Sequence, residues 1–256
     1  MKVAVLIKQV PGSESALSIA NNQKWVDEES VTFVMNPPDN YALEEALLIK
    51  ESTEGGEVVV VSMGPSRVQK VIREGLAKGA DRGIHINEDN VIERDPLIIA
   101  KCFADVLKDE RFDLVLTGLQ SDDTGMGQTG VLLGEFLGMS TATLAIETDI
   151  QEKNIRVKRE LESGWFQWIQ LPLPASISIQ SGLNSPRYPS LKGIMGAKKK
   201  DIKIIDGPQI ASSAKHQEIE KIFIPQTNKK TEIIEGEIDK VVNRIVEVLK
   251  SDIKVI

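Results

Sequence analysis

A glycine-rich run in the middle of the chain has the composition of an anion-binding loop. Residues 117–130 read Thr-Gly-Leu-Gln-Ser-Asp-Asp-Thr-Gly-Met-Gly-Gln-Thr-Gly and follow an apolar strand predicted at 113–117. We expect a helix to begin near Gln128, and the first N–H groups of a helix lack partners within it and carry partial positive charge. Gly125 and Gly127 would let the backbone approach a phosphate without interference from a Cβ atom. The run favours phosphate binding, but such turns also need glycine for steric reasons alone, so both interpretations stay open.

Two carboxylates lie within this run, at Asp122 and Asp123. A carboxylate beside a phosphate repels it. We therefore expect these side chains to cap the following helix or to hold ribose hydroxyls rather than to face an anion.

Three further segments are expected at the same edge of the molecule. They are Leu6, the turn at residues 36–39 and Met63, and each follows or lies at the carboxyl end of a predicted strand. Open α/β sheets bind ligands in the crevice beyond those ends, so the segments should converge on one site. Taken alone, the Asn-Pro-Pro-Asp sequence of the turn is more typical of a helix cap.

A second unusual run, residues 182–200, combines rigid and bulky residues. It reads Gly-Leu-Asn-Ser-Pro-Arg-Tyr-Pro-Ser-Leu-Lys-Gly-Ile-Met-Gly-Ala-Lys-Lys-Lys. Its two prolines fix backbone angles and remove donors, so we expect an extended segment without a sheet partner. Arg187, Tyr188 and Leu191 would then be held outward, as in a loop that docks another protein. The alternative is a solvated surface loop, with the terminal lysines as an ordinary charge run.

The chain offers little material for catalysis. It contains two histidines and one cysteine, far apart in sequence. We expect His85 in a core or rim position of a short strand, His216 in a polar tail, and Cys102 packed within a helix. No phosphate-binding Gly-x-x-x-x-Gly-Lys-Ser/Thr sequence is present. We predict no catalytic residue and no metal site.

The overall composition excludes several classes of function. The 256 residues carry a net charge of -7 and only 4% aromatic residues, which argues against nucleic acid as a partner. No stretch approaches the length of a membrane span, and a lone cysteine fits a reducing compartment. These features predict a soluble intracellular protein without membrane insertion.

Short apolar runs alternate with segments of helical period through the first 140 residues, which predicts an α/β fold with a doubly wound, mostly parallel sheet. The expected strands and helices are residues 2–8, 41–51, 57–62, 67–78, 83–86, 96–108, 113–117 and 128–137. In the helix at 41–51, Leu43, Ala46 and Leu47 form an apolar stripe that ends in the amphipathic stem of Lys50, with Asp39 or Asn40 as the cap.

The pattern changes after residue 137 to segments of period two, at 141–149, 154–160, 164–171 and 175–180. We interpret them as an antiparallel extension of the sheet, with a hairpin at 151–154. Trp165 and Trp168 fall on opposite faces of one strand, either as core residues or as a contact with something beyond it. The segment 209–218 is expected to be irregular, and the spacing at 238–249 predicts a helix that packs on a neighbour.

Five segments together resemble the electron transfer flavoprotein β subunit. They are Val-Leu-Ile-Lys-Gln-Val-Pro (5–11), Met-Asn-Pro-Pro-Asp-Asn-Tyr-Ala-Leu-Glu-Glu-Ala (35–46), Val-Ser-Met-Gly-Pro (61–65), Lys-Gly-Ala-Asp-Arg-Gly (78–83) and the glycine-rich run. The Asn-x-Pro-Arg-Tyr-x-x-Leu-x-x-Ile-Met-x-Ala-Lys-Lys-Lys pattern from Asn184 is similar to the recognition loop of this family. The resemblance covers the chain from Met1 to about Asp206.

The resemblance implies a nucleotide-binding fold like those of the adenine-nucleotide α-hydrolases and Rossmann proteins. It implies an α/β domain at 1–182, a recognition loop at 183–200, and a C-terminal arm and helix at 201–256 that packs on the α subunit. The implied nucleotide-binding residues are Leu6, Asn36, Pro37, Pro38, Asp39, Met63, Gly118, Leu119, Gln120, Ser121, Asp122, Asp123, Thr124, Gly125, Met126, Gly127, Gln128 and Thr129. The implied docking residues are Arg187, Tyr188, Leu191, Ile194 and Met195, with Leu191 inserted into an apolar pocket of the partner.

The resemblance also implies the cofactors and partners. This chain would bind AMP structurally, while FAD would be held mainly by the α subunit of a heterodimer and would carry the electrons. Its partners would be acyl-CoA or other flavin dehydrogenases and a membrane quinone oxidoreductase, and its location the cytoplasm, or the mitochondrial matrix in a eukaryote. Two alternatives stay open: an electron-bifurcating β subunit with a second FAD in place of AMP, and a nucleotide-sensing module resembling universal stress proteins.

Overall fold

The computed structural model describes residues 1–53, 55–89, 95–206, 216–225 and 231–255. The chain divides into two compact units, Met1–Lys221 and Ile222–Ile256. The first unit contains both of the runs singled out above.

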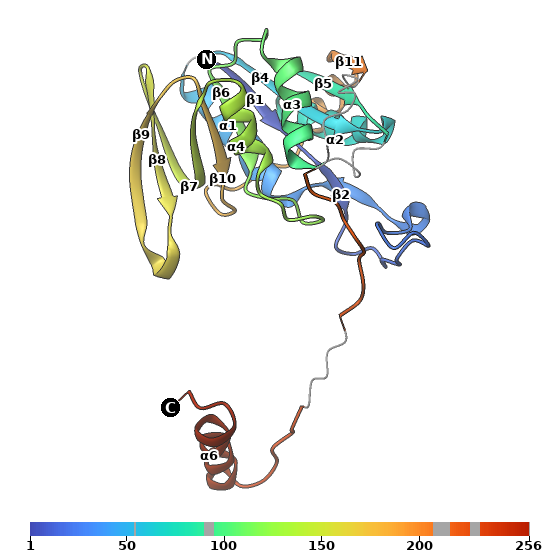
Figure 1. Ribbon diagram of the computed structural model, residues 1–256. Helices are drawn as coiled ribbons and strands as arrows, with labels where there is room; N and C mark the ends of the chain where they lie inside the picture. Colours follow the sequence, from blue (N-terminus) through green and yellow to red (C-terminus); the bar gives the residue numbers. More distant parts are fainter. Residues whose placement is uncertain (54, 90–94, 207–215, 226–230, 256) are drawn as a thin grey trace. The chain divides into compact units, whose positions relative to one another are not determined.

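The first unit is built on a nine-stranded sheet in the order β11-β5-β4-β1-β6-β10-β7-β8-β9, with a separate two-stranded sheet of β2 and β3 (Figure 1). The strands are β1 (Lys2–Leu6), β2 (Gln9–Pro11), β3 (Phe33–Met35), β4 (Glu57–Gly64), β5 (Arg82–Asn87), β6 (Leu114–Gly118), β7 (Ser140–Gln151), β8 (Asn154–Glu160), β9 (Phe166–Pro172), β10 (Ala175–Ile179) and β11 (Ile202–Asp206). In the nine-stranded sheet, the strands from β11 to β7 run parallel, while β8 pairs antiparallel with both β7 and β9. The predicted mostly parallel α/β sheet is confirmed.

The helices of this unit are α1 (Pro37–Ser52), α2 (Gln69–Lys78), α3 (Pro96–Leu107), α4 (Thr129–Phe136) and α5 (Leu191–Ala197), with short 3-10 turns at Glu28–Ser30, Ser66–Val68 and Glu162–Gly164. They cover both faces of the sheet, because successive side chains of a strand point to opposite faces. In β1, Val3 and Val5 belong to one core with α1 and α2, whereas Ala4 and Leu6 belong to the other with α3 and α4. Near-continuous apolar strands are therefore buried on both sides, as a doubly wound sheet requires.

Strand β10 differs from the sequence-based expectation. It was expected in an antiparallel extension, but it pairs parallel with β6 on one side and with β7 on the other, and all five of its residues are buried. The antiparallel part is the meander of β7, β8 and β9, whose first turn places Gln151 opposite Asn154 as predicted. Alternation alone does not distinguish the two pairings, because parallel and antiparallel strands share a period of two.

The tryptophans of this meander are not core residues. Trp165 is 72% exposed and precedes β9, while Trp168 is 40% exposed within it. The Arg156 guanidinium lies 4.3 Å from the Trp168 ring centroid, in a cation–π contact. The core interpretation of these residues is therefore wrong, and the edge of the sheet carries an aromatic surface.

Helix α1 begins four residues earlier than expected. Asn36 occupies the N-cap position without a side-chain cap, and two prolines fill the first positions of the helix, where a missing N–H costs nothing. The expected cap by Asp39 or Asn40 is wrong, because both residues lie inside the helix. The apolar stripe is confirmed, and it ends at Lys50, which donates to both carboxylate oxygens of Asp81 at 2.6 and 2.7 Å.

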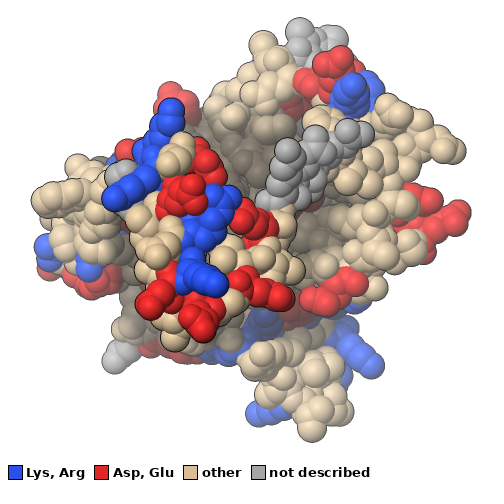
Figure 2. All heavy atoms as spheres, turned by 90° about the horizontal axis from the view of Figure 1, so that it is seen from below, with Lys and Arg blue, Asp and Glu red and all other residues tan. Residues whose placement is uncertain are grey.

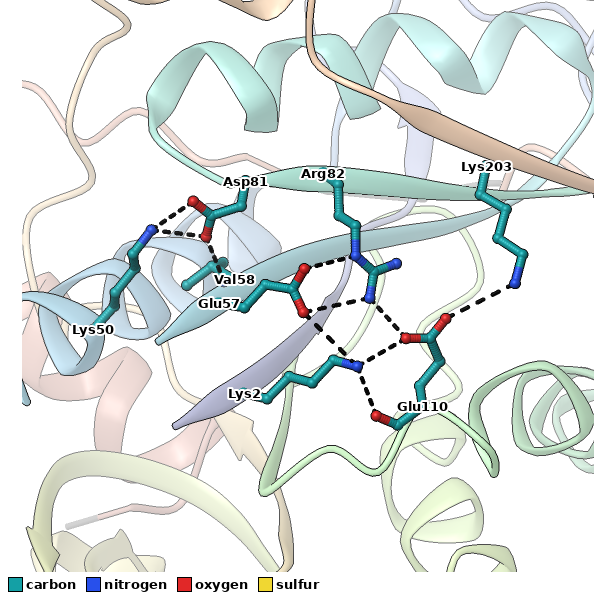
Figure 3. Close-up of polar contacts among 8 residues, drawn as sticks. All are labelled: Lys2, Lys50, Glu57, Val58, Asp81, Arg82, Glu110 and Lys203. Carbon is teal, nitrogen blue, oxygen red and sulfur yellow. Dashed lines mark hydrogen bonds and ion pairs between the residues drawn. The ribbon is translucent and has the colours of Figure 1, made fainter. Parts of the chain in front are cut away.

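The amino ends of the strands are joined by a network of charged side chains (Figure 3). Glu110 accepts from Lys2 at 2.9 Å and from Arg82 at 2.7 Å, and Glu57 accepts from Arg82 at 2.7 Å. Lys203 of β11 lies 3.9 Å from Glu110. The network ties four neighbouring strands together at the edge opposite the glycine-rich run.

Strand β11 was assigned from the sequence to the C-terminal arm, but it completes the main sheet by pairing with β5. The second unit contains helix α6 (Ile238–Glu247) and a π-helical turn (Val248–Asp252), close to the predicted helix. The expected irregular segment at 209–218 falls mostly outside the described residues. Over the face shown in Figure 2, acidic and basic side chains lie among one another and neither sign forms a continuous field. Within the described ranges, no helix is both long and apolar enough to cross a membrane.

Candidate functional site

A cavity of about 340 Å³ lies in the first unit, at the carboxyl ends of β1, β4, β6 and β10. Small-molecule sites generally have volumes between roughly 300 and 1,000 Å³. Many of the residues expected to bind nucleotide line it: Leu6, Asn36, Asp39, Met63, Gly118, Leu119, Gln120, Ser121, Thr124, Met126, Gly127, Gln128 and Thr129. Pro37, Pro38, Asp122, Asp123 and Gly125 do not line it. The segments predicted to converge at this edge do converge there.

Asp39 links three of the segments around the cavity. Its carboxylate accepts the backbone N–H of Lys8 at 2.7 Å and that of Gly118 at 3.1 Å, so it joins the ends of β1 and β6 to the first turn of α1. Burial raises the pKa of Asp39 to about 7, although its hydrogen bonds act in the opposite direction. Asp39, which the sequence predicted as a helix cap, therefore carries only part of a negative charge at neutral pH.

Asn36 fixes the loop that follows β6. Its amide nitrogen donates to the Gln120 carbonyl at 3.0 Å, and its amide oxygen accepts the N–H of Asp122 at 3.0 Å. The Asn36 side chain is buried and both of its polar atoms have a partner in the loop, so it holds the loop in place.

The two carboxylates of the glycine-rich run do not cap the next helix, which corrects one of the two expectations for them. The Asp123 carboxylate accepts from Lys8 Nζ at 2.7 Å and from the N–H of Thr124 at 2.6 Å, and its side chain is almost fully buried. Lys8 Nζ also lies 3.2 Å from the Ser121 hydroxyl. Lys8 lines the cavity and neutralises Asp123, although it was not among the residues predicted for the site. Its position just after β1 was the signal that could have found it.

Helix α4 directs unpaired backbone donors at the cavity. Gln128 occupies its N-cap position without a side-chain cap, and the first helical bond runs from Leu132 to the Gln128 carbonyl. The N–H groups of Thr129, Gly130 and Val131 precede that bond and have no hydrogen-bond partner within the described part of the chain. These three residues line the cavity, so the positive end of the helix faces it.

Glycine is required at two positions before this helix. Gly125 and Gly127 have φ angles of 62° and 64°, in the left-handed region that other residues rarely adopt. Gly130 lies so close to β6 that a Cβ atom would come 2.7 Å from the Thr117 hydroxyl. The glycines thus serve the backbone conformation and also leave the helix start open to the cavity.

Other parts of the wall come from distant segments and had no sequence signal. Ile99 and Phe103 of α3, Trp25, and Ser178 of β10 contribute side chains to the lining. Residues 217–219 also line the cavity, and the neighbouring His216 donates its N–H to the buried Asp95 carboxylate at 2.6 Å. Burial raises the pKa of Asp95, but backbone donors of His216 and Ile98 outweigh it and hold the pKa below its ordinary value. Within the described ranges, no cluster of acidic, His and Cys side chains could hold a metal ion.

The run at 182–200 is partly helical rather than wholly extended. Ser190 caps α5 by accepting the N–H of Gly193 at 3.0 Å, and the helix carries the largest apolar side chains of the run. Tyr188 is 94% exposed, Leu191 83% and Met195 73%, while Ile194 is partly exposed. Four of the five predicted docking residues therefore lie on the surface.

Arg187 differs from them, because its side chain is 32% exposed and is held against α1 rather than extended freely outward. Its guanidinium donates to Glu44 at 2.9 Å and to Glu51 at 2.6 Å, both on α1. Lys200 also differs from a solvated charge run, because its ammonium donates to the Leu76 carbonyl at 3.0 Å and to the Ala80 carbonyl at the end of α2. Burial lowers the pKa of Lys200 from its ordinary value.

The remaining predicted groups lie where the sequence placed them. Cys102 is buried in α3, and His85 is buried with its Nε2 atom 2.8 Å from the Gly64 carbonyl. The fold and the cavity together define a doubly wound α/β protein that has a small-molecule-sized cavity at the carboxyl edge of its sheet.

Comparison with known proteins identifies the family. Residues 23–209 match the model of the electron transfer flavoprotein domain. The chain is 34% identical over 261 residues to the electron transfer flavoprotein subunit beta of Methylophilus methylotrophus, covering 97% of this chain and 98% of that protein. It is 33% identical to the Bacillus subtilis protein of the same name over the full length of both, and 37% identical to the human one over about 80% of each chain. The chain belongs to the electron transfer flavoprotein family, as a β subunit.

Family membership supports the general function expected from the sequence, which is electron transfer as part of a flavoprotein. The relatives are subunits of flavoproteins that transfer electrons, so this chain is a component of such a complex and a flavin takes part in its work. It also favours this function over the nucleotide-sensing alternative.

Proposed function

We propose that this chain is the scaffold and docking subunit of a heterodimeric electron transfer flavoprotein, and that it binds AMP in the cavity at the carboxyl edge of its sheet. FAD, held mainly by the α subunit, would accept electrons from acyl-CoA or other flavin dehydrogenases and pass them to a quinone oxidoreductase. The complex would work in the cytoplasm, or in the mitochondrial matrix of a eukaryote. The observation that carries the nucleotide proposal is the open start of α4, with three backbone donors facing the cavity.

The electrostatics of the cavity suit a phosphate. The start of a helix attracts anions, and the buried Asp123 carboxylate in the loop before it is neutralised by Lys8. The Asp95 carboxylate, which lines the cavity, accepts the backbone N–H groups of Ile98 and His216. Asp39 carries only part of its charge at neutral pH because its pKa is about 7. We place the phosphate at Gly127, Gln128 and Thr129, and the apolar walls formed by Ile99 and Phe103 would cover less polar parts of the ligand.

The size of the cavity favours AMP over a second FAD. About 340 Å³ lies at the small end of the range for ligand sites, which suits a mononucleotide better than a dinucleotide. The Gln-Thr-Gly sequence at the start of α4 also resembles the AMP-binding members of the family more than the bifurcating ones.

Apolar surfaces support assembly with an α subunit. Helix α6 presents exposed Ile238, Val242 and Ile245 at helical spacing, and none of its residues is buried. An amphipathic helix is stable in water only when its apolar side is covered. We assign that cover to the α subunit, and the exposed aromatic surface of β9 is a second candidate contact.

Tyr188, Leu191, Ile194 and Met195 would contact the dehydrogenase, with Leu191 as the anchor. An exposed leucine that becomes buried on binding contributes about 1.5–3 kcal/mol, which gives a contact weak enough for rapid exchange.

The experiment is co-expression with a candidate α subunit, followed by native mass spectrometry and by quantification of AMP and flavin after acid release. A heterodimer with one AMP and one FAD supports the proposal. Two FAD molecules and no AMP would select the bifurcating alternative, and a yellow chain that purifies without a companion subunit would overturn the scaffold role. A Gly130→Val variant tests the cavity as well, because its side chain would press against Thr117 of β6 and displace the start of α4. The heterodimer should then contain less AMP but still contain FAD.

A further inference from the structure

The docking run is held to the body of the protein by a compact ion-pair network. The Nε atom of Arg187 donates to the Glu44 carboxylate at 2.9 Å, and its two terminal nitrogens donate to Glu44 and Glu51 at 2.9 and 2.6 Å. The backbone N–H of Arg187 donates to Glu44 as well, at 3.0 Å. Glu44 is 7% exposed, so its charge depends on Arg187 for compensation.

The same run has further anchors on both sides of the network. On the N-terminal side, the Asn184 amide donates to the Tyr41 carbonyl and to Glu45, both at 3.0 Å. On the C-terminal side, Arg73 of α2 donates to the carbonyls of Ala197 and Lys200 at 2.6 Å. Every one of these contacts lies on the inner side of the run, which leaves its apolar side chains outside.

We propose that the Arg187–Glu44–Glu51 network is a positioning device that holds the docking surface in its binding conformation before the partner arrives. The inference rests on the proposed docking function and gives Arg187 a role other than contact with the partner. The five donors of a guanidinium suit two carboxylates at once, and here all three nitrogens already donate to the two acids. A segment that is ordered in advance binds more tightly because less conformational entropy is lost on binding.

The position of α1 makes the network a firm support. Glu44 and Glu51 lie on the helix whose first turn is fixed by Asp39 and Asn36 at the cavity, and whose apolar stripe is buried in the core. Between the network and Leu191, the chain spans only three residues, and Pro189 restricts one of them. Movement of Arg187 would therefore displace the anchor side chain directly.

The test uses the co-expressed heterodimer with Glu51→Gln, Arg187→Gln and, as the matched control, Glu147→Gln. Glu51 and Glu147 are 55% and 56% exposed and each forms one ion pair, but Glu147 pairs with Lys158 on the distant meander. The first readout is limited trypsin digestion, scored by cleavage after Lys192 with mass spectrometry. We expect Glu51→Gln and Arg187→Gln to accelerate this cleavage by about tenfold, because local opening governs proteolysis, and Glu147→Gln to leave it unchanged.

The second readout is the rate of flavin reduction by an acyl-CoA dehydrogenase that has been reduced with its acyl-CoA substrate. We expect the second-order rate constant to fall roughly tenfold in the two network variants, with an unchanged limiting rate at saturating dehydrogenase. Arg187→Lys should recover part of the loss, since a lysine keeps the charge but not the paired geometry. Arg187→Gln leaves the buried Glu44 carboxylate without its cation, and this variant can fail to fold for that reason. In that case the result for Glu51→Gln, a change at an exposed residue, decides the outcome.

Unchanged cleavage in Glu51→Gln would overturn the inference, and so would faster cleavage combined with unchanged transfer. A Leu191→Ala variant tests the docking function separately. If transfer is insensitive to Leu191→Ala, the proposed docking function fails, whereas the digestion result still decides whether the network holds the segment.

Discussion

Replacement of Asp39 by asparagine tests how the buried carboxyl beside the cavity holds the fold. The Asp39 side chain accepts two backbone N–H groups, from Lys8 at 2.7 Å and from Gly118 at 3.1 Å. Asparagine has nearly the same shape but only one acceptor atom, so its NH₂ group would face one of these donors. The unpaired buried donor should cost about 1–3 kcal/mol at every pH.

Removal of the Asp39 charge has the opposite effect on the free energy of unfolding, and this effect depends on pH. Burial raises the pKa of Asp39 from 3.8 to about 7, which corresponds to about 4 kcal/mol at roughly 1.4 kcal/mol per pH unit. Since the pKa of Asp39 is higher in the folded state than in the unfolded state, ionisation of Asp39 lowers the stability of the fold. The contribution of the protonated carboxyl to stability is complete below pH 4, falls as pH rises, and is lost above pH 7. Asparagine does not titrate, so Asp39→Asn should be less stable than the natural chain at pH 4 and more stable at pH 8.

The assay is urea unfolding of both proteins from pH 4 to pH 8, after removal of any bound nucleotide, because a ligand raises the apparent stability. Other titrating groups are common to both proteins, so the difference between their free energies of unfolding isolates Asp39. Asp105→Asn provides the control for removal of one exposed acid, on α3. Parallel stability curves, without a crossover between pH 4 and pH 8, would show that burial does not keep Asp39 protonated.

Three further changes are expected to act at separate places. Leu191→Ala should weaken dehydrogenase binding about 10- to 100-fold, because about 1.5–3 kcal/mol of apolar burial is lost. The AMP and flavin contents should not change. Stopped-flow transfer rates equal to those of the natural chain would show that Leu191 is not the anchor. Gly118→Ala would place a Cβ atom against the Asp39 carboxylate and 2.8 Å from Pro38 Cβ. This overpacking should lower the free energy of unfolding by about 1–3 kcal/mol and reduce the amount of bound AMP. An unaltered AMP content would contradict the prediction. For Glu110, burial acts to raise the pKa, but hydrogen bonds from Lys2 and Arg82 outweigh it and hold the pKa below 4.5. The resulting stabilisation of the fold is present above pH 4.5 and is lost as pH falls through the folded pKa. Urea unfolding should therefore show Glu110→Gln to be less stable than the natural chain at neutral pH, and the difference between their free energies of unfolding should shrink under acidic conditions.

Local patterns in the sequence were sufficient for most of the elements. The stripe of Leu43, Ala46 and Leu47 predicted the buried side of α1, and the continuous apolar runs predicted strands covered on both faces. The convergence of Leu6, Asn36, Met63 and Gly118 followed from topology, because the carboxyl ends of parallel strands meet at one edge of a sheet. These inferences need only periodicity and chain direction, which the sequence contains.

The partners of polar side chains could not be predicted in this way. Asp39 was expected to cap its own helix, but it binds Gly118, which is 79 residues away. Arg187 was expected to face a partner protein, but it pairs with Glu44, 143 residues earlier. Strand β10 has the same alternation in either direction, and its parallel pairing depends on β6 and β7.

The sequence by itself therefore determined the class of fold, the family and the edge of the sheet at which the cavity lies. The tertiary structure decided which polar groups are left for ligands and partners, and which are used within the protein. The physical reason is that burial and pairing depend on distances between residues far apart in the chain, whereas secondary structure depends on near neighbours. For this protein, that distinction leaves the N–H groups of α4 open to the cavity, the Leu191 side chain exposed, and the Arg187 guanidinium engaged with α1.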